Sequence, residues 1–488
     1  MGTRREYGDF QTPAALADAV CGRLRADGVE AATVLEPTCG QGRLLVAAAA
    51  AFPGARLVGH ELDPGHAADA RRALSPLGNR ARVLRRDFFA TDWSRSIARM
   101  DGPILALGNP PWVTNAELGV MGSDNLPTKR PVPGMRGLDA RTGHSNFDIS
   151  EWMVLQLVEA LQRRDATVAM LLKSSVARRI LRAARTRGLP LSDARMIRID
   201  ARAHFGVRVD ACLFVAVTRV ERAATTSSTS TGCRVYPNLG ARRADSTLGF
   251  RQETLVADTD AYDRAAPCIG EATPRWRSGV KHDCRDVMEL TGDGDGFRNG
   301  LGERAHLERA HVFPLLKGAD LARGVAVQPR AAGRYVVVPQ RRIGQDTAAL
   351  CERAPLTWAY LQAHATRLDA RRSRIYRGQP PFSIFGVGDY TFKPWKVCIP
   401  GLYRSTEFSL VGPVDGQPVV LDDTCYFIGF DDEDSARRAH ALLDSEAARD
   451  VLAAFTFWDD KRPIKQDVLR RLSLEALSRR LGAPTSPA

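Results

Sequence analysis

"VLEPTCGQGRLLVAAAA", residues 34–50, reads as a buried strand, a glycine-containing turn and a helix. The strand is expected at Thr33–Glu36 and the helix at 42–52. A short apolar strand, a turn containing Gly40 and Gly42 and then a helical run are typical of a parallel strand that turns directly into a helix. The stretch therefore predicts the first βα unit of an α/β sheet.

The same alternation of apolar runs and helical patterns continues to about residue 220. A helix with an apolar stripe is expected at 149–162. The predicted strands are Thr33–Glu36, Arg56–Glu61, Ala81–Arg85, Ile104–Leu107, Thr167–Leu172, Met196–Asp200 and Ala211–Val217. This pattern predicts a Rossmann-like, seven-stranded parallel sheet covered by helices on both faces.

A chain of 488 residues is longer than one hydrophobic core usually supports. The Ser/Thr-rich tract "ERAATTSSTSTG" at 221–232 breaks the alternation and is predicted to be a linker. Beyond it, residues 233–488 mix strand-like and helical segments, which predicts a second domain of α+β type. The first domain is then 1–220.

The composition indicates a folded protein outside membranes. Hydrophobic residues make up 44% of the chain and charged residues 26%. The longest apolar run, 44–52, is about half of the roughly 20 residues that a membrane-spanning helix needs. The N-terminus has no signal-peptide core. We therefore expect a cytoplasmic protein.

The net charge of +13 favours an anionic partner such as nucleic acid. Only eight of the 69 basic residues are lysine, so a GC-rich genome also accounts for part of the arginine content. The nine cysteines form no C-x-x-C pair, and neither a zinc ribbon nor a dithiol redox motif is indicated. No metal site is predicted.

Four successive predicted strands end in residues suited to ligand binding. Glu36 offers a carboxylate to a cationic group, and Glu61 ends the next strand, where an acid commonly binds two ribose hydroxyls. The third strand is followed by Asp87, an acceptor for an amino group, and by Phe88, an apolar platform. Asn109 follows the fourth. Such sheets bind ligands at this carboxyl edge.

The glycine turn favours S-adenosylmethionine over a dinucleotide. Gly40 and Gly42 let the backbone approach a ligand, but no glycine stands three residues further on, as a pyrophosphate-binding G-x-G-x-x-G requires. An acid beside the turn also suits an amino-acid ammonium group better than a phosphate.

Asn109-Pro110-Pro111-Trp112 ends the fourth strand in a rigid turn. Two prolines remove two backbone donors and fix the path of the chain. The following segment, 113–146, is rich in Gly, Pro, Asn and charged residues with little hydrophobic period. A loop of that length beside such a turn predicts a functional flap.

Several stretches together resemble one known family. They are "YGDFQTP" at 7–13, "LEPTCGQG" at 35–42, the Asn-Pro-Pro-Trp turn and "AHFGVRVDACLFVAV" at 203–217. Their order resembles that of the gamma-group DNA adenine-N(6) methyltransferases of restriction-modification systems, which are class I S-adenosylmethionine-dependent enzymes. More weakly, "RSGVKHDC", "FPLLKGADL", "RYVVVPQ" and "FSIFGVGDYTFKPWKVCIPGLY" look like the target-recognition domain of such enzymes.

The resemblance implies roles for particular residues. Thr12 and Pro13 would belong to the cofactor site, and Trp112 and Phe205 would stack on a target adenine flipped out of duplex DNA. The Asn109 side-chain carbonyl and the Pro110 backbone carbonyl would each accept one N–H bond from the adenine amine, which requires no strong base. Arginines within 369–382 and aromatic or lysine residues within 385–396 are candidates for DNA contacts.

The leading hypothesis is thus a site-specific adenine methyltransferase for double-stranded DNA, protecting host DNA in a restriction-modification or phage-defence system. It would be cytoplasmic and nucleoid-associated, and any cognate endonuclease would be a separate chain. Three alternatives stay open. The first is a cytosine-N(4) methylase, although Ser is more usual at the position of Asn109 in that family. The second is an RNA or protein methyltransferase. The third is a non-catalytic DNA-binding subunit of a defence complex.

Overall fold

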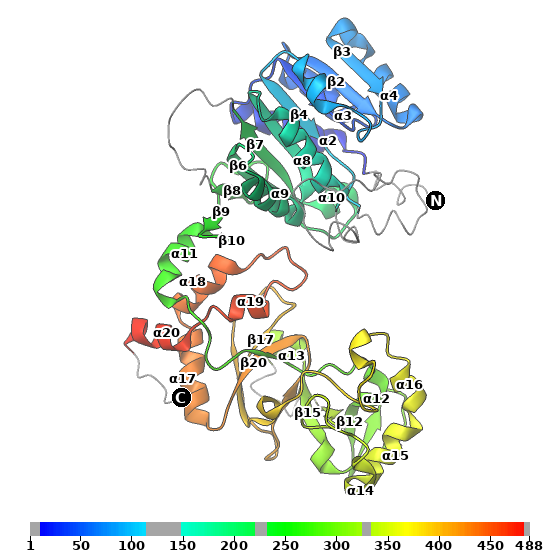
Figure 1. Ribbon diagram of the computed structural model, residues 1–488, viewed down its shortest axis with the longest axis vertical. Helices are drawn as coiled ribbons and strands as arrows, with labels where there is room; N and C mark the ends of the chain where they lie inside the picture. The colour runs from blue at the N-terminus through cyan, green and yellow to red at the C-terminus, as the bar shows by residue number, and fades with distance from the viewer. Residues whose placement is uncertain (1–9, 114–147, 220–231, 325–332, 483–488) are drawn as a thin grey trace. The chain divides into compact units, whose positions relative to one another are not determined.

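The computed structural model describes residues 10–113, 148–219, 232–324 and 333–482. The chain divides into two compact units, Met1–Thr259 and Asp260–Ala488 (Figure 1). Each unit has its own sheets and buried core, so each is described by itself.

The first unit contains all seven predicted strands. They are β1 (Thr33–Glu36), β2 (Arg56–Glu61), β3 (Ala81–Arg85), β4 (Ile104–Gly108), β5 (Ala166–Lys173), β6 (Leu191–Ile199) and β7 (Ala211–Thr218). They lie in the order β6-β7-β5-β4-β1-β2-β3. The α/β fold is confirmed, but β7 runs antiparallel to both β5 and β6, so the prediction of a wholly parallel sheet is wrong. The connection from β6 to β7 is too short for the crossover that parallel strands need.

Three further strands extend this sheet beyond the predicted domain boundary. They are β8 (Cys233–Tyr236), β9 (Ser246–Arg251) and β10 (Thr254–Val256), giving ten strands among the described residues. β8 pairs with β6, whose free edge accepts it, so residues 233–256 belong to the first unit and the boundary predicted at 221–232 is wrong. Residues 220–231 of the predicted linker lie outside the described residues.

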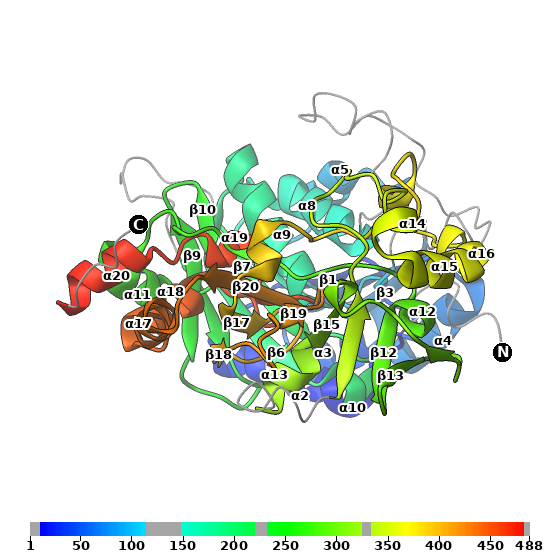
Figure 2. The same ribbon diagram turned by 90° about the horizontal axis from the view of Figure 1, so that it is seen from below.

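Two groups of helices cover the sheet. The helices are α2 (Ala14–Ala26), α3 (Arg43–Ala51), α4 (Pro64–Leu74), α5 (Trp93–Ala98), α8 (Ile149–Leu161), α9 (Ser174–Arg187) and α10 (Ala201–Phe205). α2, α3 and α4 pack together, and α5, α8 and α9 form the second group. Figure 2 shows the two groups on opposite sides of the strands, as expected for an α/β sheet.

The second unit has the α+β character predicted for it. Its four-stranded sheet consists of β11 (Arg277–Ser278), β20 (Cys425–Phe430), β17 (Trp395–Pro400) and β18 (Ser409–Val411). Its six-stranded sheet consists of β14 (Arg304–Ala305), β13 (Gly296–Asn299), β12 (Glu289–Asp293), β16 (Arg334–Val337), β15 (Val312–Leu316) and β19 (Val420–Leu421). Helix α17 (Glu433–Leu443) packs against β17, β18 and β20, which buries one face of the smaller sheet.

The remaining helices of this unit are short. They are α11 (Thr259–Ala265), α12 (Arg285–Met288), α13 (Gly318–Ala322), α14 (Leu350–Arg353), α15 (Pro355–Ala363), α16 (Ala365–Asp369), α18 (Glu446–Phe455), α19 (Gln466–Leu469) and α20 (Leu474–Leu481). Among the helices described in either unit, none has the length and apolar character needed to span a bilayer.

Candidate active site

The order of strands brings the predicted site residues to one edge of the first unit's sheet. β4, β1, β2 and β3 are neighbours and run parallel, so their carboxyl ends meet at the same edge. Glu36 and Glu61 are the last residues of β1 and β2, and Asp87 and Asn109 follow β3 and β4 closely. The sheet thus gathers three carboxylates and one amide.

Glu36 is a buried carboxyl group that keeps one unpaired oxygen. The residue is 3% exposed, and the Leu45 backbone N–H in the first turn of α3 bonds the carboxyl group. Its Oε2 atom has no hydrogen-bond partner in the part of the chain that the structure describes. Burial, together with the nearby charge of Glu61, raises the pKa of Glu36 well above its usual range. A cationic ligand group would provide the missing partner.

Glu61 holds the glycine turn in place. Its Oε2 accepts a hydrogen bond from the Gly40 backbone N–H at 2.7 Å, and its Oε1 accepts one from Asp63 N at 2.8 Å. A carboxylate oxygen can accept more than one bond, so the predicted contact with ribose hydroxyls stays compatible with these contacts. The carboxylate therefore links the end of β2 to the turn after β1.

The two glycines of the turn are needed for different reasons. Gly40 has φ +50°, and a Cβ atom there would lie 2.5 Å from Gln11 Oε1. Gly42 has φ +78°, begins α3, and lies against Ala70 of α4, which a Cβ would approach to 3.0 Å. Both positions require a left-handed backbone that favours glycine. At Gly42 the close neighbour is the protein's own helix.

The segment 10–13 connects the glycine turn with the Asn-Pro-Pro-Trp turn. Gln11 Oε1 accepts a hydrogen bond from Gln41 N at 3.1 Å. On the other side, Asn109 Nδ2 donates to the Phe10 carbonyl at 2.8 Å and to Thr12 Oγ1 at 3.3 Å. Thr12 is 7% exposed, so its hydroxyl faces the amide of Asn109 from within the protein. The Pro13 residue precedes α2 as its N-cap.

These contacts fix which way the Asn109 amide points. A backbone carbonyl only accepts hydrogen bonds, so the Phe10 oxygen requires the NH₂ side of the amide. The carbonyl side, Oδ1, then faces elsewhere and is buried, and it has no hydrogen-bond partner among the described residues. An unpaired buried acceptor costs about 1–3 kcal/mol. The site therefore presents an acceptor oriented for a donor that the described part of the chain does not supply.

Trp112 and Phe205 meet, together with a third aromatic residue. The Trp112 and Phe205 ring centroids are 5.1 Å apart, and Phe10 lies 5.8 Å from Trp112 and 6.0 Å from Phe205. Trp112 is 5% exposed, and its indole N–H donates to the Leu171 carbonyl at 3.1 Å. Trp112 therefore lies in the core, and its stacking on a target base stays a prediction. Phe205, at the end of α10, is half-buried.

Two adjacent aromatic residues, Phe88 and Phe89, follow β3, and the first of them is the predicted apolar platform of the cofactor site. Phe88 is 4% exposed and packs against Trp93 at 4.9 Å, so its ring belongs to the core. The next residue, Phe89, is half-buried and stacks on Trp152 of α8 at 5.0 Å. Asp87 accepts a bond from Phe89 N at 2.8 Å. The sequence offers two adjacent phenylalanines at this position, and only the packing in the structure shows that Phe88 is buried and Phe89 half-buried.

Sequence reasoning missed an ion pair beside this edge. Asp148, the N-cap of α8, is 2% exposed, and its Oδ2 lies 2.9 Å from Nζ of Lys173. Lys173 ends β5, the strand next to β4. The Asp before an apolar-striped helix was a readable capping signal, whereas its lysine partner, 25 residues away, was not.

The residues at this edge fit S-adenosylmethionine. Glu36 has a buried oxygen available to the ammonium group, and Glu61 and Asp87 are acidic residues suited to hydroxyl and amino donors. No cluster of three or more His, Cys, Asp or Glu residues that would hold a metal ion occurs within the described ranges.

Known proteins similar to this chain agree with that fit. The Type II methyltransferase M.NspV of Nostoc sp. (strain ATCC 29411 / PCC 7524) is 41% identical over 480 residues, 98% of either chain. The Type II methyltransferase M.XamI of Xanthomonas campestris pv. amaranthicola is 34% identical over 114 residues, 23% of this chain and 21% of M.XamI. No protein-family model matches.

A solved structure extends the likeness to both units. The Type IIL restriction-modification enzyme MmeI in complex with DNA aligns with 94% of this chain and 64% of its own, with a TM-score of 0.52 and 13% identity. At that identity the match concerns the fold alone. It covers the sheet with the candidate site and most of the second unit.

Proposed function

This chain belongs to the Type II methyltransferases of restriction-modification systems, and from that premise we propose that its substrate is the 6-amino group of adenine in duplex DNA. It is a DNA methyltransferase that uses S-adenosylmethionine. The choice of adenine, the flipping of the base and the roles of individual residues are the proposed parts.

The orientation of Asn109 is the observation that carries the proposal. Its Nδ2 is held by Phe10 and Thr12, and its buried Oδ1 has no partner within the ranges that the structure describes. The adenine amine is a donor of the kind that this oxygen lacks. Binding such an amine would replace an unsatisfied acceptor with a hydrogen bond, which favours the substrate over solvent.

The second acceptor is the Pro110 carbonyl. Pro110 is buried, and Pro111 after it limits the conformation of the turn. With one N–H bound to Asn109 Oδ1 and one to Pro110 O, the amine would be drawn toward tetrahedral geometry and its lone pair released from the ring. Fixed dipoles of this kind contribute about 2.7–4 kcal/mol each where they have been removed in other enzymes.

S-adenosylmethionine, when bound, supplies a methyl group activated by a positively charged sulfur. The protein's part is to hold it: Glu36 would bind the ammonium group, Glu61 the ribose hydroxyls and Asp87 the adenine amine. The Gly40–Gly42 turn would face the amino-acid portion. Thr12, predicted to belong to the cofactor site, is better placed to orient Asn109.

The target base would be held by aromatic contact. An adenine inside a duplex cannot reach a turn set at a sheet edge, so the base must be flipped out. Phe10 and Phe205 are both half-buried in the Phe10–Trp112–Phe205 cluster, and Phe205, to which the family resemblance gives this role, is the proposed stacking surface. Trp112, being buried, would support Phe205 and the turn from beneath.

The second unit, Asp260–Ala488, is proposed to recognise the target sequence. Arg371 within the predicted basic stretch 369–382 is not a free phosphate ligand, because it donates to the Ser383 carbonyl at 2.7 Å and lies over the Tyr376 ring. We expect the protein to act in the cytoplasm on the nucleoid, beside a separate cognate endonuclease.

The test is methyl transfer from labelled S-adenosylmethionine to unmodified genomic DNA, with the product base identified by mass spectrometry. N(6)-methyladenine should form with the intact protein and not with Asn109→Ala. Asn238→Ala, which removes an exposed asparagine of the same unit, is the matched control. Formation of N(4)-methylcytosine instead would overturn the adenine assignment while leaving the role of the Asn109 acceptor intact.

A further inference from the structure

An exposed loop of the second unit is the second feature of interest. The first is the sheet edge that carries Glu36, Glu61, Asp87 and Asn109, here called the catalytic edge after its proposed role. Residues 341–346, here called the tip, follow β16 after a short buried stretch, and every one of them is exposed. Within it, Ile343 is 51% exposed, among the most exposed large apolar side chains described. A single exposed isoleucine is common on protein surfaces, so the inference depends on the way this loop is held and on the arginine beside Ile343.

Buried polar side chains anchor the tip at both ends. Before it, Gln340 is 2% exposed and exchanges two hydrogen bonds with the backbone of Ile384, at 3.2 and 3.1 Å. After it, Thr347 is 1% exposed and donates to the Pro381 carbonyl at 2.5 Å. The ends of the tip are thus fixed to the same neighbouring segment.

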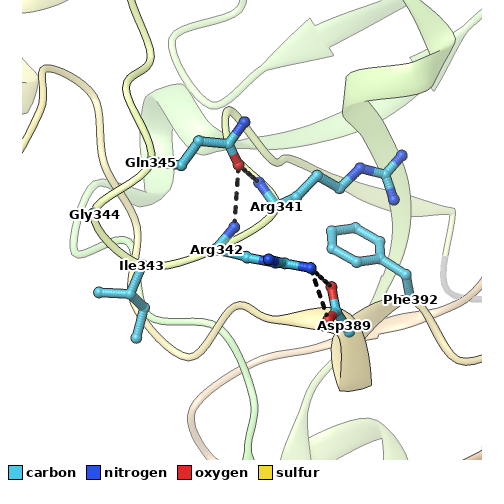
Figure 3. A pocket seen from close by; sticks show the side chains of 7 residues that line it. All are labelled: Arg341, Arg342, Ile343, Gly344, Gln345, Asp389 and Phe392. Atoms are coloured by element: carbon cyan, nitrogen blue, oxygen red, sulfur yellow. Dashed lines mark hydrogen bonds and ion pairs between the residues drawn. The ribbon is translucent and has the colours of Figure 1, made fainter.

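The tip is also clamped from within. Gln345 Oε1 accepts hydrogen bonds from the backbone N–H groups of Arg341 at 2.7 Å and Arg342 at 3.2 Å (Figure 3). Between them and Gln345, Gly344 has φ +77°, which closes the turn. A loop ordered before it meets a partner loses less conformational entropy on binding.

The two arginines differ in what they offer. The Arg341 guanidinium lies 4.0 Å from the centroid of the Phe392 ring, and within the described ranges it has no carboxylate partner. Stacking fixes its plane while leaving its N–H edge free to donate. Arg342 pairs with Asp389 at 3.2 Å, but both side chains are about three-quarters exposed, so this pair is weak and exchangeable.

We propose that the tip enters a groove of duplex DNA, with Arg341 donating to an acceptor oxygen or nitrogen and Ile343 lying against base edges. The proposal rests on the proposed function and names a part of the second unit that reads DNA. Figure 3 shows the Ile343 side chain directed away from the Arg342–Asp389 pair. This ion pair therefore does not cover Ile343. Planar guanidinium groups match phosphate oxygens and guanine N7/O6, and apolar side chains contact thymine methyl groups.

The test compares full-length variants in two assays. Binding to unmethylated genomic DNA fragments is measured over a range of salt concentrations, and methylated sites are mapped by sequencing on a plasmid. Arg341→Ala should weaken DNA binding at least about fivefold, the lower end of the loss of one contact. Ile343→Ala should alter the preference at one position of the methylated site.

The salt dependence separates the two sources of acceptor for Arg341. If Arg341 contacts a phosphate, Arg341→Ala should reduce the magnitude of the slope of log affinity against log salt by about one and keep the site preference. A base contact leaves the slope nearly unchanged and relaxes one position of the site. Arg341→Lys keeps the charge but loses the planar fork, so it should restore function only in the phosphate case.

Arg449→Ala is the control, because Arg449 is another exposed arginine of the same unit, paired with exposed Asp444 at 3.2 Å. If Arg341→Ala and Ile343→Ala bind DNA and choose sites as Arg449→Ala does, the tip proposal is wrong. That result would leave N(6)-methyladenine formation intact, so failure of the tip and failure of the proposed function are distinguishable. Unchanged thermal unfolding and cofactor affinity would show that each variant is folded.

Discussion

The catalytic edge and the tip are both proposed to bind a ligand, but their polar groups are satisfied differently before the ligand arrives. At the edge, Glu36 and Asn109 each keep a buried oxygen that has no partner among the described residues, and leaving such an atom unpaired costs free energy until a ligand binds. At the tip, Gln345 satisfies the backbone donors, and the side chains that would meet a partner are in water. Substitutions at the edge should therefore affect chemistry strongly, and those at the tip should affect affinity modestly.

The largest effect is expected for Asn109→Ala. The substitution removes the oriented acceptor, and we expect kcat to fall by about 10²–10³-fold or more, as when one preorganised hydrogen-bonding group is removed elsewhere. Affinity for the cofactor should change little. Single-turnover methyl transfer with saturating DNA measures the first quantity, and calorimetric titration measures the second. A variant with near-normal kcat would mean that the unpaired Oδ1 is not part of the reaction.

Glu36→Gln tests whether the buried carboxyl serves the cofactor. Its pKa is raised by burial and by Glu61, so the folded state favours the protonated form. The stability this gives is complete at pH below about 4.5, the ordinary value, and is lost as pH rises toward the folded pKa. At neutral pH, Glu36→Gln should therefore raise the Tm of the free protein, by about 2–4 °C if the gain is near 1 kcal/mol.

The same substitution should weaken cofactor binding. An ammonium group favours the ionised carboxylate, so affinity of the intact protein should rise with pH up to about 7.7, where an α-amino group begins to lose its proton. Glu36→Gln should flatten this dependence. Glu159→Gln, an exposed glutamate paired with Arg187, is the control. Weaker stability and unchanged affinity would make Glu36 a purely structural cap of α3.

Thr12→Val separates orientation of Asn109 from cofactor binding. The change removes the 3.3 Å contact and keeps the shorter bond to the Phe10 carbonyl, so we expect kcat to fall about fivefold, the equivalent of one ordinary hydrogen bond. The KM for S-adenosylmethionine should stay the same. A raised KM with normal kcat would return Thr12 to the cofactor site. Thr186→Val, on the exposed surface of α9, is the matched control.

The smallest effect is expected for Gln345→Ala. Loss of the clamp frees two exposed backbone N–H groups, which water can satisfy, so stability should hardly change. DNA affinity should fall about two- to fivefold because the tip must be ordered on binding. Fluorescence anisotropy with labelled duplex measures this. The control is Gln417→Ala, which removes a half-buried glutamine of the same unit whose Nε2 donates to the Arg309 carbonyl at 3.0 Å. A loss as large as that of Asn109→Ala in methyl transfer would contradict the contrast between the two regions.

Much of the catalytic edge could be predicted because it depends on local order along the chain. Neighbouring parallel strands place their carboxyl ends at the same edge, so the meeting of Glu36, Glu61, Asp87 and Asn109 there is predictable from their positions alone. The orientation of the Asn109 amide was not predictable, since it depends on a carbonyl 99 residues away. Which of Phe88 and Phe89 is buried was likewise not predictable, because it depends on the packing of Phe88 against Trp93.

The sequence by itself determined the α/β character, the seven strands and the residues at their ends, because hydrophobic period and turn chemistry are local properties. Only the tertiary structure decided that β7 runs antiparallel, that residues 233–256 join the first sheet and that Trp112 is buried. It also decided that Gln340 and Thr347 anchor an exposed tip. These features depend on pairing and packing between residues far apart in the chain. Such contacts cannot be predicted from the local sequence pattern.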